Sequence, residues 1–407
     1  MSTTWHLFRY ETLKAFRDKT LPFILVLTSG LTFLSVYAGD QWLEFIRDTQ
    51  KKIKQSQQEQ LSANIGDLRA HEKRTDTTTM ESPANPAILY SGKRAFALKP
   101  LSPLMVLCVG QSDLHISYSA FTGVYDHLLL FENEIVNPIN LMLGKPDWHF
   151  LLTFLLPLFI IALCFNIYPQ ESELGTLKLL LTQHVPLKKF LWTKVVVRFT
   201  IFTLAFLLST IIALIIFEPV VLTGYSGYTL LFFAVAIIYC GFWFVICYLV
   251  NIFKKDSVFN GLVLSATWLT MLFVVPSFIL SYVTFQWPVS SNNTHILDLK
   301  QQINTINRDT VLARKYAGFP HYKEASAKVN AKLIMPAWYT GFLAWQENAF
   351  YMEETTQHKA ISQLLKQEKF LEKCAYFVPP FFSAHVFQKL SASGLPDFIE
   401  YNNQVTD

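Results

Sequence analysis

Five long apolar segments, separated by polar stretches, dominate this sequence. Each is made mainly of Leu, Ile, Val, Phe and Ala, and a helix needs roughly 20 such residues to cross a hydrocarbon core of about 30 Å. The pattern therefore predicts a mainly α-helical membrane protein with about five transmembrane helices. The segments lie at residues 21–38, 149–168, 195–217, 228–250 and 258–283.

Two long polar segments, residues 39–147 and 284–407, separate or follow these apolar runs. The first predicts a helix from Gln41 to about Lys73, a loop rich in Ser, Thr and Pro, and then short strands, so we expect an α+β segment. The pattern leaves open whether that helix continues the first span as a stalk or is only a solvated surface helix. The second segment has helical apolar spacing, including Ile296, Leu299 and Ile303, and is expected to be mostly α.

The distribution of Lys and Arg predicts the orientation. Basic residues gather in residues 1–20, in the connector at 169–194 and in the turn with Lys254 and Lys255, whereas the turn at 218–227 has none. Short loops rich in Lys and Arg stay in the cytoplasm. We therefore expect the N-terminus and the connector on the cytoplasmic side of the membrane, and both long segments, with the C-terminus, on the outer side.

Residues 1–20 do not resemble a cleavable signal peptide, because they are too polar and too long for its basic start. Leu13 and Phe16 can share one helical side while Arg9, Lys14 and Arg17 take another. This spacing predicts an interfacial helix on the cytoplasmic membrane surface. A basic tail without regular structure is the alternative.

Composition excludes several classes of function. The chain has 407 residues, 52% hydrophobic and 16% charged, and its net charge of +4 does not indicate a nucleic-acid partner. The sequence contains no phosphate-binding GxxxxGK[ST] loop, no HExxH and no GxSxG, so we expect neither an enzyme nor a chain that hydrolyses ATP itself. No CxxC or His pair indicates a metal. Cys108 and Cys374, in the two outer segments, could form a disulfide.

The connector between the second and third spans carries the most specific pattern. It begins with Glu171 and Glu173, which we expect in the first turn of a helix, where carboxylates complement the positive helix end. Gly175 is costly inside a helix and indicates a bend or a close backbone approach. Leucines at helical spacing then form an apolar face that either a partner protein or the lipid surface must cover. These leucines are Leu174, Leu177, Leu180 and Leu181.

The connector sequence ESELGTLKLLLTQHVPLKKFLWTK resembles the cytoplasmic coupling segment of ABC-transporter permeases of the type-two export class. Upstream, NPINLMLGKPDWHFLLTFLLPLF is similar to a subgroup with a large extracytoplasmic domain between spans one and two. The resemblance implies a permease that works with a second copy or a paralogous permease and with separate ABC ATPase subunits, which bind ATP and Mg. The ATPase contact would be made by Glu171, Glu173, Gly175, Thr176, Leu177 and Leu180.

The same resemblance implies that the transporter exports an unidentified substrate or extracts a lipid-linked one from the membrane. Members of the class usually have six spans with both termini inside, and no sixth span is found after residue 283. Two alternatives remain open at this stage. One is an ABC-type mechanical transducer that acts on a periplasmic partner without transport. The other is a membrane-anchored sensor or adhesin with no ATPase.

Overall fold

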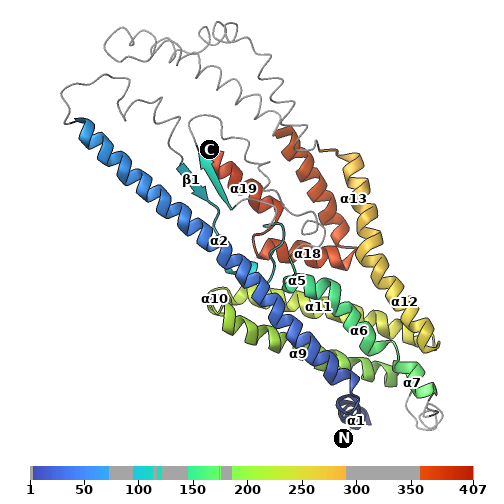
Figure 1. Ribbon diagram of the computed structural model, residues 1–407. Coiled ribbons are helices and arrows are strands. Elements are labelled where there is room, and N and C mark those ends of the chain that lie inside the picture. Colours follow the sequence, from blue (N-terminus) through green and yellow to red (C-terminus); the bar gives the residue numbers. More distant parts are fainter. Residues whose placement is uncertain are drawn as a thin grey trace.

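The computed structural model describes residues 3–72, 95–112, 117–121, 145–173, 175, 186–289 and 358–406. Within these residues, five helices are long and apolar enough to cross a membrane, which agrees with the five apolar segments of the sequence. Figure 1 shows them as an elongated bundle, with α1 and the N-terminus at one end and the C-terminus toward the other. The candidate spans are Thr20–Ala70, Trp148–Glu173, Leu187–Phe217, Ser226–Ile252 and Ser257–Gln286.

The described helices and strands follow one another along the chain in this order: α1 (Thr3–Arg17), α2 (Thr20–Glu72), β1 (Ala95–Leu98), the 3₁₀ helix η1 (Pro103–Val106), β2 (Tyr118–Phe121), α5 (Trp148–Phe150), the π-helical turn η3 (Leu151–Leu155), α6 (Leu156–Cys164), α7 (Ile167–Glu173), α9 (Leu187–Phe217), α10 (Val220–Gly224), α11 (Ser226–Ile252), α12 (Ser257–Leu269), the π-helical turn η4 (Thr270–Val274), α13 (Val275–Gln286), α18 (Pro379–Leu390) and α19 (Leu395–Thr406). Residues 358–375 are also helical.

Helix α2 is a single helix of 53 residues, so the first span and the polar run after it form one rod (Figure 1). The stalk interpretation of the sequence is therefore confirmed. The helix packs along α9, and Arg47 forms two hydrogen bonds of 2.7 and 3.3 Å with the buried carboxylate of Glu218 at the end of α9. At Gly39 a Cβ atom would lie 2.0 Å from the carbonyl oxygen of Val106, so only glycine lets η1 approach the rod this closely.

The second span is distorted where Pro157 follows the π-helical turn η3. Proline has no N–H, so the carbonyl of Thr153 lacks its helical donor. The hydroxyl of Tyr239 on α11 donates a 2.9 Å hydrogen bond to that carbonyl instead. The indole N–H of Trp268 on α12 reaches the neighbouring carbonyl of Phe154 at 3.1 Å. The two carbonyls at the distortion thus receive hydrogen bonds from α11 and α12, the helices that pack against it.

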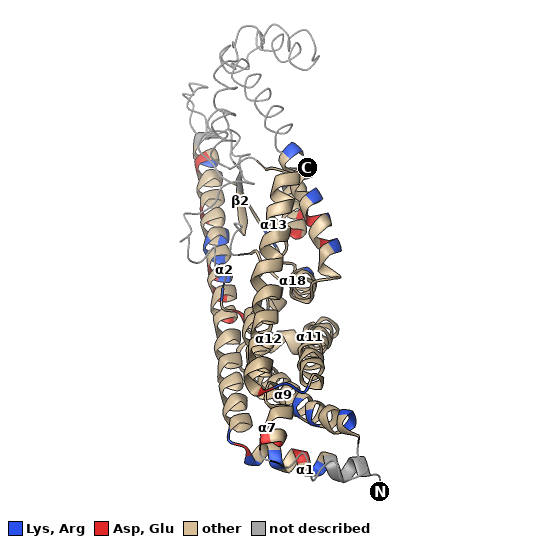
Figure 2. Ribbon diagram, turned by 90° about the vertical axis from the view of Figure 1, so that its right-hand side faces the viewer, with Lys and Arg blue, Asp and Glu red and all other residues tan. Residues whose placement is uncertain are grey.

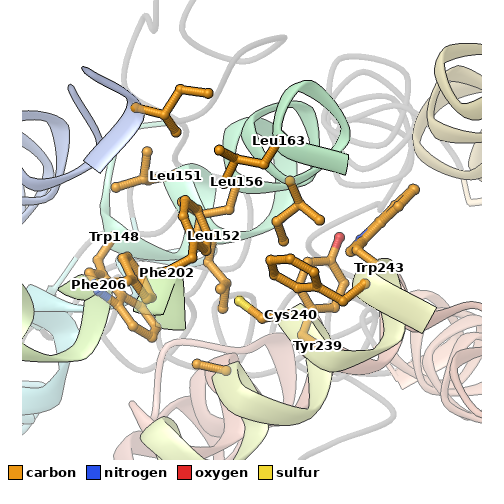
Figure 3. Packing of buried hydrophobic residues seen from close by; sticks show 14 of the residues in the cluster. Trp148, Leu151, Leu152, Leu156, Leu163, Phe202, Phe206, Tyr239, Cys240 and Trp243 are labelled. Atoms are coloured by element: carbon orange, nitrogen blue, oxygen red, sulfur yellow. The ribbon is translucent and has the colours of Figure 1, made fainter. Parts of the chain in front are cut away.

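The hydrophobic core lies where α6, α9 and α11 meet (Figure 3). Trp148, which is fully buried, stacks on Phe206 at 5.4 Å between ring centroids, and its indole donates a 2.9 Å hydrogen bond to Thr210. The ring of Phe387 on α18 packs edge-on against Trp148 at 5.7 Å. This aromatic cluster joins the C-terminal segment to the second and third spans.

The elements outside the spans form a small cap on α2 and on the ends of the spans. Strands β1 and β2 are antiparallel, with Ala95 opposite Phe121. The side-chain amide of Gln50 on α2 donates hydrogen bonds to carbonyls next to this hairpin, and the hydroxyl of Tyr401 on α19 donates to Ala97 at 3.0 Å. Part of the first segment that was expected to be strand is instead η1 and its flanking loop, which pack in the core. The described part of the second segment is helical.

The Cys108–Cys374 disulfide that the sequence left open is not formed in this structure, in which both thiols are free. Cys108 is fully buried in the loop after η1, whereas Cys374 is only half-buried in the helix at residues 358–375. Burial raises the pKa of the Cys108 thiol well above its ordinary value, which keeps it protonated and unreactive.

The two ends of the bundle are formed by different elements, and Lys and Arg lie toward both, including α2 and residues 358–375 away from α1 (Figure 2). Lys and Arg gather on α1 and at the start of α9 (Figure 2), at the end where α7 also lies. The hairpin, α18 and α19 lie toward the opposite end (Figure 1). The described parts of the two polar segments, which the sequence placed on one common side, therefore lie toward the same end. The N-terminus lies at the other.

Candidate functional site

The second span breaks between α6 and α7, at the end of the bundle that carries α1. A break leaves backbone groups without helical partners, and buried groups of this kind need others. The buried side chain of Asn251 donates a 3.0 Å hydrogen bond to the carbonyl of Cys164 and accepts one of 3.0 Å from the N–H of Tyr168. The side chain of Asn260 donates to the carbonyl of Phe165 at 3.1 Å.

These two asparagines connect the break to other spans, because Asn251 is near the end of α11 and Asn260 is in the first turn of α12. The hydroxyl of Ser257 adds a 2.8 Å hydrogen bond to Asn166 and one of 3.0 Å to Glu173. We call this set the asparagine clamp. It ties α7 to the fourth and fifth spans, so a displacement of α7 must either move them or break several buried hydrogen bonds.

A second set of contacts ties α7 to α1 and α9. The Glu171 carboxylate is 3% exposed and lies 2.5 Å from the ammonium of Lys194 and 2.6 Å from that of Lys14. Lys194 is itself buried and lies 3.9 Å from the carboxylate of Glu11. We call these four residues the charge cluster. A buried charge is tolerated only when it is paired, so the cluster holds three elements at a defined distance.

Burial and pairing shift the pKa values of two members on α1. Burial raises the pKa of Glu11 above its ordinary value, and the positive charges of Lys194 and Lys14 offset only part of this. Burial alone would lower the pKa of Lys14, but the hydrogen bond and the charge of Glu171 outweigh it, so that pKa is raised. Lys14 therefore stays charged beside Glu171 at neutral pH.

Helix α7 ends at Glu173, and Gly175 follows with φ +71°, a conformation that favours glycine. This left-handed φ agrees with the bend expected at Gly175, and a Cβ atom there would meet nothing within 4 Å among the described residues. The expectation that Glu171 and Glu173 open a helix is wrong, since both lie in the last turn of α7. The negative helix end disfavours carboxylates there, and for Glu171 the two lysines compensate.

The predicted ATPase-contact residues fall into three groups. Glu173 and Gly175 are exposed at the end of α7. Glu171 is buried, and its basic partners come from this chain, so an ATPase could reach it only if these ion pairs opened. Thr176, Leu177 and Leu180 lie outside the described residues, as do Asn137 and Gly144 of the upstream pattern. Contact with an ATPase stays a prediction for all six.

Sequence reasoning missed the asparagine clamp and the partners of Glu171. A signal existed for the clamp, because Asn251 and Asn260 are amide side chains at the ends of two otherwise apolar segments. Such residues cost free energy in a membrane unless they are hydrogen-bonded, and they therefore mark helix contacts. No comparable signal links Glu171 to Lys14, which is 157 residues away in the sequence.

Comparison with known families gives one match. The family model described as "ABC-2 family transporter protein" matches residues 5–350, a range that includes α1, all five candidate spans, the charge cluster and the asparagine clamp. No curated protein and no solved structure matches the chain.

Proposed function

Because the chain belongs to the ABC-2 family of transporter proteins, we propose that it is a multi-pass permease subunit of an ATP-driven transporter in a bacterial inner membrane. The family match over residues 5–350, together with five candidate membrane helices, is the observation that supports this proposal most. ATP and Mg would bind to a separate ATPase subunit, and a second permease copy or a paralogous permease would complete the membrane part.

In this proposal the ATPase binds at the exposed end of α7 and the segment after it. Glu173 would face basic groups of the ATPase, Gly175 would allow the chain to turn toward it, and Thr176, Leu177 and Leu180 would fill an apolar groove on its surface. Exposure of Glu173 and the left-handed φ of Gly175 support this assignment. Glu171 would contribute by holding α7 against α1 and α9.

Movement of the ATPase would then reach the spans by two routes. The charge cluster would pass it to α1 and α9, and the asparagine clamp would pass it to α11 and α12. The central members of the two sets, Glu171 and Lys194 in one and Asn251 and Asn260 in the other, are buried and polar. Their geometry is therefore more rigid than that of an exposed contact. The transported substrate would be exported, or a lipid-linked one extracted from the membrane.

A mechanical transducer that moves an extracytoplasmic partner is the second candidate function. It is favoured by the uninterrupted rod α2, and by the packing of Phe387 against Trp148 at the end of the spans. Accumulation of a substrate inside liposomes that contain the permease and its ATPase would exclude this candidate. ATP hydrolysis without accumulation, altered by an added periplasmic partner, would support it.

Copurification tests the ATPase contact. The tagged, detergent-solubilised protein should bring an ABC ATPase with it, and Glu173→Lys should abolish this by reversing the charge at the contact. Glu173 also accepts a hydrogen bond from Ser257, so Ser257→Ala is the matched control, which removes that bond and keeps the carboxylate. Glu59→Lys, on the exposed outer part of α2, controls for charge.

Both controls should retain the ATPase. Copurification that survives Glu173→Lys would refute the proposed docking site. Absence of any ATPase with the wild-type protein, under conditions that keep other permease complexes intact, would count against the permease proposal itself.

A further inference from the structure

A cavity of about 170 Å³ lies between α1 and α9, beside α7. Its walls are unusually rich in charge, since six of its eight lining residues are ionisable. They include Lys14 and Lys194 of the charge cluster and two arginines, Arg17 at the end of α1 and Arg198 one turn beyond Lys194 on α9. We call it the interfacial cavity.

Two of the four cations that line the cavity, Arg17 and Arg198, form no salt bridge with a carboxylate among the described residues. The guanidinium of Arg198 donates a hydrogen bond to the carbonyl of Leu163. A guanidinium has five N–H donors in a planar fork that fits the oxygens of a phosphate. Most of the donors of these two side chains are therefore available for an anion that enters the cavity.

The carboxylates around the cavity are already engaged by groups of this chain. Glu171 is shared by Lys14 and Lys194. Asp18 accepts hydrogen bonds from the backbone and hydroxyl of Thr20 at the start of α2. Glu11 lies 3.9 Å from the ammonium of Lys194, and the cavity lining has four basic residues against two acidic ones. The balance of charge is therefore positive, and an anion is the complementary ligand.

The surface of α1 identifies the source of that anion. Tyr10, Leu13 and Phe16 are 63%, 65% and 54% exposed, whereas Glu11 and Ala15, on the side that faces α9 and the cavity, are buried. Large apolar side chains on a short basic helix at the end of membrane spans lie stably among lipid acyl chains. The same helix thus presents apolar groups to lipid and basic groups to the cavity beside it.

We propose that the interfacial cavity binds the phosphate of an anionic glycerophospholipid from the membrane leaflet that contacts α1, with Arg17 and Arg198 as its ligands. The acyl chains would lie against the exposed apolar residues of α1. A lipid in this position would fill the space between α1 and α9 next to Glu171, and so would stabilise the charge cluster. The proposal does not depend on transport or on an ATPase.

The test measures the thermal unfolding temperature of the purified chain in detergent, during titration with short-chain phosphatidylglycerol, phosphatidylcholine or inorganic phosphate. Phosphatidylglycerol should raise the unfolding temperature of the wild-type protein in a saturable manner, because a ligand that binds only the folded state stabilises it. Phosphatidylcholine and inorganic phosphate should have a smaller effect. Arg17→Gln and Arg198→Gln should each weaken the apparent affinity for phosphatidylglycerol roughly tenfold, the effect of losing one charged hydrogen bond.

Arg9→Gln is the matched control, because Arg9 is an exposed arginine on α1 that does not line the cavity. It should retain the wild-type affinity. If Arg198→Gln does not fold, Arg17→Gln decides, since Arg17 is exposed and its loss leaves the packing intact. An equal response to phosphatidylcholine, unchanged affinity in Arg17→Gln, or an equal loss in Arg9→Gln would overturn the proposal. Full reproduction of the effect by inorganic phosphate would overturn the lipid as the source.

Discussion

Replacing Asn251 by leucine should destabilise the chain through the break between α6 and α7. Leucine has a similar size but no polar atoms, so the packing volume is kept while the hydrogen bonds are lost. The carbonyl of Cys164 and the N–H of Tyr168 would each lose the partner that Asn251 supplies. Asn251 is fully buried, so water cannot readily replace it.

The magnitude follows from these two bonds. A buried backbone group left without a partner costs about 1–3 kcal/mol in a water-soluble protein, whereas hydrogen bonds between membrane helices average about 0.6 kcal/mol with a maximum near 1.7. Two such groups at the edge of the spans therefore suggest a loss of about 2–4 kcal/mol. At about 2 °C per kcal/mol for a large chain, the unfolding temperature should fall by roughly 4–8 °C.

Thermal unfolding of the detergent-solubilised protein, followed by intrinsic tryptophan fluorescence at a fixed heating rate, measures this change. Thr200→Ala is the control, because the Thr200 hydroxyl bonds only within its own helix, to Val196 at 2.9 Å, on an exposed face. Its unfolding temperature should stay within about 1 °C of wild type, as expected for surface substitutions. An equally small change in Asn251→Leu would refute the role that we assign to the clamp.

Three further substitutions test other parts of the structure in the same assay. Gly39→Ala places a Cβ atom 2.0 Å from a backbone oxygen and should lower the free energy of unfolding by about 1–3 kcal/mol. The control Gly30→Ala, on the same helix and with nothing within 4 Å, should leave the unfolding temperature equal or slightly higher. The reverse order would contradict the close packing of η1 against α2. Glu171→Gln should lower the free energy of unfolding by about 3–5 kcal/mol, because it leaves the buried ammonium of Lys194 poorly paired. Adding Lys194→Met should recover much of this stability. A double variant no more stable than Glu171→Gln alone would disprove the pairing. The pKa of Glu11 is raised, so the folded chain holds that proton more tightly than the unfolded chain, and stability is lost as the pH rises from 4.5 through the raised value. Glu11→Gln should therefore reduce the fall in unfolding temperature between pH 4.5 and neutral pH, and an unchanged pH profile would show that this carboxyl does not titrate differently on folding.

The spans were predictable because hydrophobicity is a property of the residues themselves. An uncharged run such as 21–38 needs little tertiary information to be identified as a membrane helix. The distortion at Pro157 was only partly predictable. Proline excludes a regular helix there, but the π-helical turn depends on whether a donor such as the Tyr239 hydroxyl is in reach.

The candidate site was less predictable, because it depends on contacts that are distant in sequence. Charge and spacing identified both Glu171 and Glu173, yet only the position of Lys14 and Lys194 in space decides which carboxylate is buried. The helix that was expected to begin at these residues ends there instead, because Gly175 adopts a left-handed conformation. A glycine close after a predicted helix was a usable signal of its end.

The uninterrupted course of α2 has a mechanical consequence. At 1.5 Å per residue its 53 residues extend for about 80 Å, of which about 30 Å can lie in hydrocarbon. A tilt of only about 5° around its N-terminal end would therefore sweep its far tip through about 7 Å. With this length, a rigid α2 would convert sub-ångström adjustments at its base into displacements as large as a side chain.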